Sequence, residues 1–184
     1  MTIEKGQVLI PIARATISRA LGRDMQANEN AGWLREPGAC FVTLTQHGEL
    51  RGCIGSLEAH RPLLDDVKAN AYAAAFHDTR FSPLGVAELD YTEIEISLLS
   101  AMQPMTFRDE HDALAQLRPG IDGVVFECNS YRSTFLPQVW KQLPDREAFM
   151  SHLKRKAGLA ADYWSEDVKL AWYTVEKWKE SELK

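Results

Sequence analysis

The sequence has no apolar run of about 18 residues, so it contains no segment typical of a transmembrane helix. Its first residues also lack the basic and apolar regions of a signal peptide. From these two absences we expect a cytoplasmic protein without a membrane partner.

Cysteine is scarce, and no cysteine lies in a metal-binding pattern. The three cysteines are Cys40, Cys53 and Cys128, and no two have CxxC spacing. In the cytoplasm such thiols are expected to be reduced. The five histidines form neither an HxxxH nor an HExxH pattern, so we expect no metal and no cofactor. Walker, GxGxxG, GxSxG and EF-hand patterns are also missing.

Positive charge is in the minority. The chain has 21 Lys and Arg against 26 Asp and Glu, a formal net charge of −5 and a pI of about 5.6. Nucleic-acid binders usually carry a basic surplus, because phosphate contacts dominate their affinity. We therefore expect no nucleic-acid partner. The basic run Lys154-Arg155-Lys156 lies on an expected helix, and we interpret it as a solvated face.

The spacing of apolar residues predicts a mixture of helices and strands. Helices are expected over residues 6–21, 61–76, 110–117, 137–142 and 145–157, and strands over 39–46, 49–57, 91–100, 123–128, 131–135 and 168–173. Pro11 implies that the first helix either starts or kinks near it. Because helices and strands do not alternate regularly, we predict an α+β fold with antiparallel sheets.

The stretch from Leu50 to Ser56 reads LRGCIGS and follows a His47-Gly48 pair. That pair between two β-rich runs predicts a hairpin with a two-residue turn. In this register Gln46 faces Glu49, Leu44 faces Arg51 and Val42 faces Cys53. Arg51, Cys53 and Gly55 would then share one face of the strand, and Leu50, Gly52 and Ile54 the other. A one-residue slip would reassign all these partners.

Cys53 has two interpretations. It is a nucleophile or a thiol that contacts a partner, with Arg51 favouring the thiolate and Gly52 and Gly55 letting a ligand approach the backbone. Alternatively, it is a small buried hydrophobic residue, which is the commonest role of a free cysteine.

The segment after the helix 61–76 carries His77, Asp78 and Arg80. These side chains could bind an anion or position a base. They could also form a helix C-cap with a local Asp78–Arg80 pair. Glu95 points away from the apolar face of its strand, where it would serve as a base or in a solvent-facing pair.

A further polar group lies around the strand 131–135 and the helix start at Pro137. Arg132, Thr134 and Gln138 could line a polar cleft. The alternative is that Thr134 serves strand propensity and Gln138 the first turn of the helix.

Several separate motifs occur in an order that resembles the AMMECR family, named after a human chromosomal deletion region. They are LRGCIGS, AAAFHDTRFSPL (73–84), EIEISLLS (93–100), STFLPQVW (133–140), and KAGL followed by Trp164. The chain departs from the family pattern at Pro11, at Thr79 and at Ala101-Met102, which affects local turns.

The resemblance implies two lobes, each an antiparallel sheet with flanking helices. The larger would comprise residues 1–100 and 166–184, and the smaller would be an insertion over 101–165. The RGCIG segment would face a cleft between them. Bacterial and archaeal members often occur with Memo-like and radical SAM proteins, which suggests a three-part system.

Two classes of function follow from this pattern. We favour a binding or scaffold module that captures a protein segment, from a Memo-like or radical SAM partner, because no obvious base neighbours Cys53 in the sequence. The alternative is an enzyme in which Cys53 is a nucleophile or reactive thiol. Arg51 or Arg80 would then hold an anionic group, and Glu95 or His77 would be the base.

Overall fold

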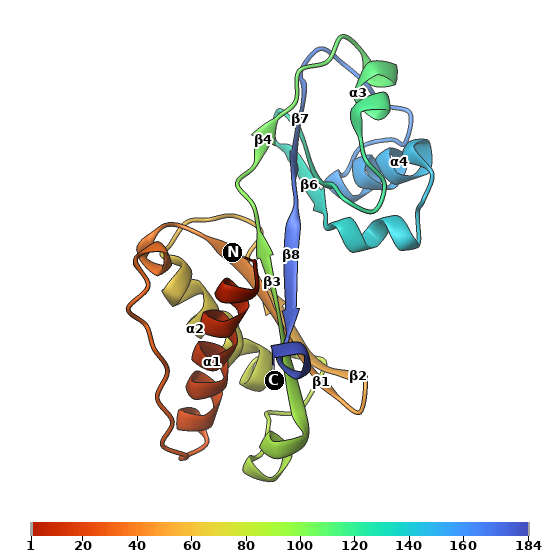
Figure 1. The fold of residues 1–184 in the computed structure, drawn as a ribbon. Helices are drawn as coiled ribbons and strands as arrows, with labels where there is room; N and C mark the ends of the chain where they lie inside the picture. Colours follow the sequence, from red (N-terminus) through yellow and green to blue (C-terminus); the bar gives the residue numbers. More distant parts are fainter. Residues whose placement is uncertain (1, 184) are drawn as a thin grey trace. The chain divides into compact units, whose positions relative to one another are not determined.

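The computed structural model describes residues 2–183, which divide into two compact units (Figure 1). The first unit holds the chain up to Leu99 and again from Glu176, and the second runs from Ser100 to Val175. Each unit contains one four-stranded antiparallel sheet together with helices. The predicted α+β class is therefore confirmed.

The sheet of the first unit has the strand order β2-β1-β3-β8. Its strands are β1 (Ala39–Gln46), β2 (Glu49–Gly55), β3 (Thr92–Leu99) and β8 (Val175–Lys179). The helices are α1 (Thr2–Ala20) and α2 (Leu63–Phe76), with 3₁₀ turns η1 (Gly32–Arg35), η2 (Val86–Tyr91) and η4 (Glu180–Leu183). Helix α1 starts well before Pro11 and continues past it.

Alternation along the central strands decides which face of this sheet meets the helices. Val42, Leu44, Ile94 and Ile96 are fully buried and belong to one core with apolar residues of α1 and α2. Because successive side chains point to opposite faces, the residues between them project from the other face. We call that side of the sheet the outer face.

The hairpin between β1 and β2 turns at His47 and Gly48, as predicted. Both have positive φ, 52° and 82°, which is the geometry of a type I′ turn. The pairing of Gln46 with Glu49 also matches the prediction. From Arg51 onward the predicted register is wrong, because a β-bulge shifts it by one residue.

At the bulge, Thr45 pairs with Leu50 but Leu44 pairs with Gly52, so Arg51 is the extra residue. Cys53 consequently lies opposite Thr43 rather than Val42. The predicted pairing of Leu44 with Arg51 is replaced for the same reason.

The sheet of the second unit has the order β4-β7-β5-β6. Its strands are β4 (Gln103–Pro104), β5 (Gly123–Cys128), β6 (Tyr131–Phe135) and β7 (Val168–Tyr173). Its helices are α3 (Glu110–Gln116) and α4 (Arg146–Ala157), with the 3₁₀ turn η3 (Pro137–Lys141). We expected the strand at 168–173 to belong to the first sheet, but it pairs with β5 and β4. The unit therefore ends at Val175 rather than near residue 165, because only β8 returns to the first sheet.

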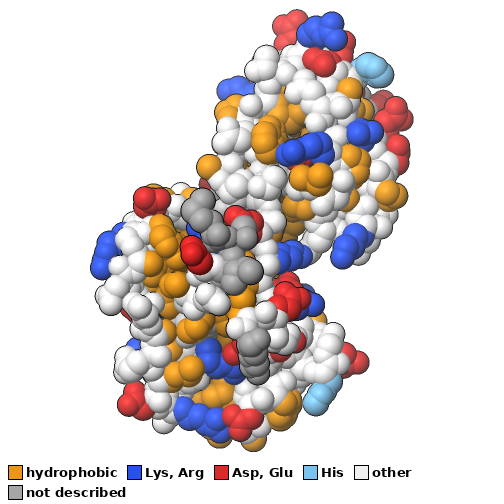
Figure 2. Space-filling view, in the orientation of Figure 1, with side chains coloured by type: hydrophobic (Ala, Val, Ile, Leu, Met, Phe, Trp, Pro, Cys, Tyr) orange, Lys and Arg blue, Asp and Glu red, His pale blue; other side chains and the backbone are white. Residues whose placement is uncertain are grey.

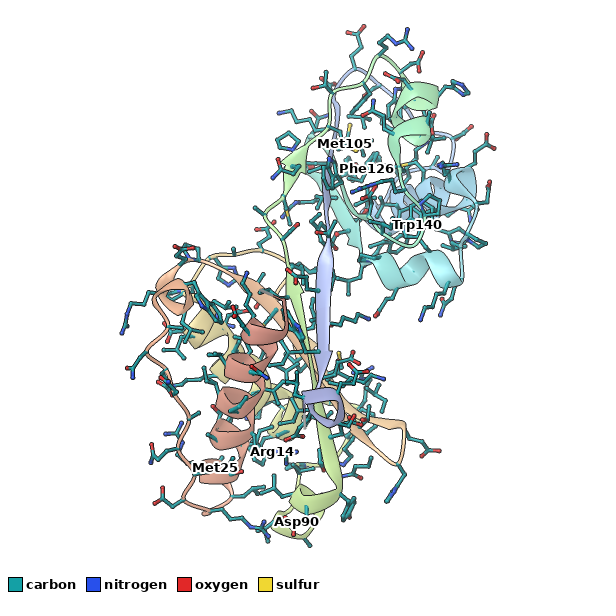
Figure 3. The ribbon with its side chains drawn as sticks, in the orientation of Figure 1. Arg14, Met25, Asp90, Met105, Phe126 and Trp140 are labelled. Carbon is teal, nitrogen blue, oxygen red and sulfur yellow. The ribbon has the colours of Figure 1, made fainter. Side chains whose placement is uncertain are left out.

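The core of the second unit is aromatic. The rings of Trp140 and Phe149 stack with centroids 3.7 Å apart, and Phe126 is fully buried with them (Figure 3). Lys154 on α4 is 1% exposed and pairs with Glu110 at 2.5 Å, so the basic run is not a purely solvated face.

None of the helices within residues 2–183 has the length and apolar character needed to cross a membrane.

Candidate functional site

The thiol of Cys53 lies on the outer face of the first sheet. Its Sγ is 3.3 Å from the hydroxyl of Thr43, the residue opposite on β1. Thr43 in turn lies opposite Glu95 on β3, and Glu95 is 4.0 Å from the ammonium of Lys179 on β8. These four residues form one line across all four strands, which we call the Cys53 row.

The edge of the sheet at Cys53 is covered by side chains. Asp78 accepts a hydrogen bond from the backbone N–H of Cys53 at 2.9 Å, and Arg80 donates to the Cys53 carbonyl at 3.4 Å. The two side chains also pair with each other at 2.7 Å, so the local pair that the sequence suggested is present. Hydrogen bonds from Arg80, and then from the Cys53 backbone, hold the pKa of the Asp78 carboxyl well below its usual range despite burial.

Arg51, the extra residue of the bulge in β2, takes part in a second ion pair. Its Nε and Nη2 donate to the two carboxylate oxygens of Glu88 at 3.0 and 3.2 Å. Glu88 also accepts hydrogen bonds from the Gly85 backbone and the Gln46 amide. The hydrogen bonds from Arg51, followed by the one from Gly85, lower the pKa of Glu88 to about 2. The ring of Phe81 lies near both arginines, 5.9 Å from Arg51 Cζ and 5.5 Å from Arg80 Cζ.

The two glycines of LRGCIGS are explained by packing within the chain. A Cβ on Gly52 would lie 2.1 Å from the carbonyl oxygen of Ala74 on α2. A Cβ on Gly55 would lie 2.2 Å from the ring of Phe41. We expected these positions to leave room for a ligand at the backbone, but the space is filled by α2 and by Phe41.

The last residue of the motif is held by a buried polar network. Asp66 is fully buried, and accepts hydrogen bonds from the Ser56 hydroxyl at 2.6 Å, the Cys40 N–H at 2.9 Å and the Asn70 amide at 3.0 Å. Arg61 pairs with the same carboxylate at 2.7 Å. Burial, with the nearby Asp66 charge, raises the pKa of the Cys40 thiol far above its usual range. Cys40 is therefore a structural thiol, in contrast to the half-buried Cys53.

The structure brings together only some of the residues that the sequence singled out. Arg51, Gly52, Cys53 and Gly55 lie on β2, with Asp78 and Arg80 at its edge and Glu95 two strands away in the Cys53 row. His77 is exposed at the C-terminus of α2, where its ring meets Tyr72 edge-on at 5.3 Å.

The other predicted polar residues belong to the second unit. Thr134 lies within 3.1 Å of the Tyr173 hydroxyl, Arg132 pairs across the sheet with Glu127, and Gln138 is exposed on η3.

Three residues that contact the candidate site were missed by the sequence analysis, namely Thr43, Glu88 and Phe81. Thr43 lies opposite Cys53 because the bulge shifts the register by one residue. The pairing could have been predicted only if the position of the bulge had been known. Glu88 and Phe81 meet Arg51 from segments far along the chain, and their one local signal is that Phe81 follows Arg80 in the HDTRF segment.

A hollow of about 530 Å³ lies in the first unit near the end of α1 and η2. Side chains of both charge signs gather there (Figure 2), and Arg14 and Asp90 lie near its rim (Figure 3). Arg14 is used by the fold, because it donates to Glu180 and to the carbonyls of Leu89 and Thr92. Among residues 2–183, no three His, Cys, Asp or Glu side chains are grouped in a way that could hold a metal ion.

The fold and the LRGCIGS site define an α+β protein with two antiparallel sheets and a cysteine on an edge strand, and comparison with known proteins gives the family. The model of the AMMECR1 family matches residues 10–178, so this chain belongs to that family. Protein MJ0810 of Methanocaldococcus jannaschii is 33% identical over 99% of this chain and 93% of its own length. A protein of Aeropyrum pernix is 35% identical over 96% of this chain and 79% of its own length.

A solved structure has the same fold. The crystal structure of the uncharacterized protein PH0010 from Pyrococcus horikoshii matches with a TM-score of 0.78 and 31% sequence identity, covering 96% of this chain and 92% of that one.

Proposed function

We propose that this chain is a binding component that receives a protein partner on the Cys53 row. The observation that supports this proposal is the surroundings of the Cys53 thiol. Its described contact within hydrogen-bonding distance is the hydroxyl of Thr43, which is not a base at neutral pH. The candidate bases lie elsewhere, since His77 packs on Tyr72 and Glu95 is paired with Lys179.

The row has the mixed character of a protein-docking surface. It presents a thiol, a hydroxyl, a carboxylate and an ammonium in one line, and Lys179 is 51% exposed in its side chain. Charge pairs at such a surface select a partner more than they add affinity. The proposed partners are a Memo-like protein and a radical SAM protein, on the basis of the association that the family resemblance implies.

The edge strand argues for a contact through side chains rather than through an added strand. Strand addition needs free backbone groups at a sheet edge. At Cys53 those groups already bind Asp78 and Arg80. A partner would therefore meet the outer face of the sheet and leave the edge as it is.

The test is co-purification and calorimetry with a Memo-like and a radical SAM protein from the same genome. Glu95→Lys, which reverses a charge in the row, is expected to weaken binding at least about tenfold. Glu176→Lys is the matched control, because Glu176 lies on β8 on the same side as the buried Trp178, away from the outer face. The proposal is wrong if neither protein binds, or if both variants weaken binding equally.

A second candidate function is thiol chemistry at Cys53. The observation that favours it is the Arg80 guanidinium, which reaches the Cys53 carbonyl and places positive charge beside the thiol. An assay for this function needs a substrate, but the reactivity of the Cys53 thiol can be measured directly, through the rate at which iodoacetamide labels it at different pH values.

A further inference from the structure

The fold leaves one nitrogen of the Arg51 guanidinium unused. Nε and Nη2 bind Glu88, whereas Nη1 is buried and has no hydrogen-bond partner among the described residues. Arg51 as a whole is only 9% exposed. A buried charged donor without an acceptor is unfavourable and rare in folded proteins. Nη1 is the single buried side-chain nitrogen or oxygen in this condition within residues 2–183.

The carboxylates around Arg51 cannot supply the missing acceptor. Glu88 accepts from Arg51 Nε and Gln46 through Oε1, and from Arg51 Nη2 and Gly85 through Oε2. A carboxylate has about four lone-pair positions, so all of those on Glu88 are in use.

Asp78 is equally saturated. It accepts from the backbone N–H and Nε of Arg80 through Oδ1, and from Cys53 N–H and Arg80 Nη2 through Oδ2. None of these bonds uses Nη1 of Arg80, whose side chain is 55% exposed. In this cluster of two arginines and two carboxylates, guanidinium N–H groups therefore remain without acceptors, whereas the carboxylate oxygens already accept as many hydrogen bonds as they can. An excess of donors is suited to a ligand whose oxygen atoms accept hydrogen bonds.

The ring of Phe81 lies close to both guanidinium groups. Its ring centroid is 5.9 Å from Arg51 Cζ and 5.5 Å from Arg80 Cζ. Phe81 is half-buried on the irregular segment between α2 and η2, where its N–H donates to the Asp78 carbonyl at 3.0 Å. The contact of the Arg80 guanidinium with this aromatic face is weak, because the Arg80 side chain is exposed to water. An oxyanion binds a guanidinium more strongly and through two parallel hydrogen bonds.

We propose that Arg51 and Arg80 form an oxyanion-binding site covered by Phe81, which takes a carboxylate or a phosphate group when the ring moves aside. Nη1 of Arg51 is the anchor, and Arg80 contributes from the exposed side. None of the four residues of the Cys53 row belongs to this site, so the inference does not rest on the proposed function.

The test is a titration of the protein carrying ¹⁵N-labelled arginine, with inorganic phosphate and with acetate as separate probes. The Arg51 Nη signals are expected to shift in a saturable way with at least one probe. The probe that binds more tightly identifies the preferred ligand as phosphate or carboxylate. Phe81→Ala is expected to tighten binding about tenfold, because the competent state no longer requires displacement of the ring. Tyr72→Ala is the control, since Tyr72 is an exposed aromatic residue of the same unit that contacts Phe76 and His77.

Arg51→Lys keeps the positive charge but removes Nη1, and it is expected to abolish the gain seen with Phe81→Ala. If that variant does not fold, Arg80→Gln provides the same test from the exposed side, with an expected loss of about tenfold in affinity. The proposal is overturned if folded Phe81→Ala protein binds neither anion with a millimolar dissociation constant or better. It is also overturned if binding leaves the Arg51 signals unmoved, or if Tyr72→Ala gives the same gain.

Discussion

The carboxylate of Asp78 accepts a hydrogen bond of 2.9 Å from the backbone N–H of Cys53, although 25 residues separate them in the sequence. Together with Arg80, which donates to the Cys53 carbonyl, it occupies both outward backbone groups of one edge residue. An exposed sheet edge is a template for pairing with other chains, and covering it is a common protection. The pair thus fixes Cys53 and closes the edge at the same place.

Asp78→Asn is expected to lower the free energy of unfolding at pH 7 by about 1–3 kcal/mol, because it weakens hydrogen bonds to a buried carboxylate. The effect should depend on pH with a definite sign. Arg80 depresses the pKa of Asp78 in the folded state, whereas the unfolded value is about 3.9. The stabilisation is therefore complete above that value and is lost as pH falls through the folded pKa.

Denaturant unfolding from pH 7 to pH 2 measures this difference. The gap between wild type and Asp78→Asn should be constant near neutral pH and narrow below about pH 4. Asp65→Asn changes an exposed carboxylate on α2 and should show a much smaller gap throughout. If the difference in stability between wild type and Asp78→Asn were the same at low and neutral pH, the Asp78–Arg80 charge pair would be contradicted.

Gly52→Ala is expected to destabilise the first unit by about 2 kcal/mol or more, as overpacking does. The added Cβ would lie 2.1 Å from the backbone carbonyl oxygen of Ala74, which cannot move without shifting α2. Gly32→Ala is a matched control with no atom within 4 Å, and should change stability by less than about 0.5 kcal/mol. Equal effects in thermal unfolding would show that β2 and α2 are not packed so closely.

Cys53 is expected to be the cysteine that iodoacetamide labels in the folded protein. Cys40 is fully buried and Cys128 is 1% exposed, whereas Cys53 is half-buried on the outer face. Burial also raises the pKa of Cys40, which keeps that thiol protonated and unreactive. Peptide mass spectrometry after brief labelling measures all three sites in one sample.

The pH dependence of the same labelling separates the two candidate functions. Fast labelling of Cys53 in mildly acidic solution would favour the enzyme, because only a stabilised thiolate reacts quickly there. Labelling of Cys40 or Cys128 at the rate of Cys53 would contradict the burial of those residues.

Lys154→Met is expected to destabilise the second unit by about 1–3 kcal/mol, because it removes the buried partner of Glu110 and leaves that carboxylate uncompensated. The double variant Lys154→Met with Glu110→Gln should recover part of the loss, since no unpaired charge remains. Unfolding followed by tryptophan fluorescence measures both, because Trp164 lies 5.4 Å from the Lys154 ammonium. A double variant less stable than the sum of the singles would contradict this account.

Much of the fold followed from short-range patterns. The turn at His47 and Gly48, the strands over 123–128 and 131–135, and the apolar face of β3 come from periods and turn residues that act within a few positions. The family could be predicted because several motifs occur in the expected order, and together they span most of the chain rather than one helix or strand.

Other features depend on contacts that local patterns do not encode. The bulge at Arg51 moves Cys53 by one place, and nothing in the strand's alternation marks the extra residue. Strand 168–173 alternates equally well for either sheet, so only pairing with β5 decided where it belongs. The buried position of Lys154 likewise depends on Glu110, which lies 44 residues away.

The sequence by itself determined the fold class, the family and the segment that carries the candidate site residues, because residue periodicity and ordered motifs are local properties of the chain. Tertiary structure alone decided that the two glycines admit Ala74 and Phe41, that Asp78 and Arg80 close the edge at Cys53, and that Arg51 meets Glu88 and Phe81. Phe41 meets Gly55 across the bulged hairpin, and the other contacts join β2 to α2 and to the segments that follow it. These approaches depend on how the hairpin, α2 and the later segments pack together, and packing is a property of the whole unit.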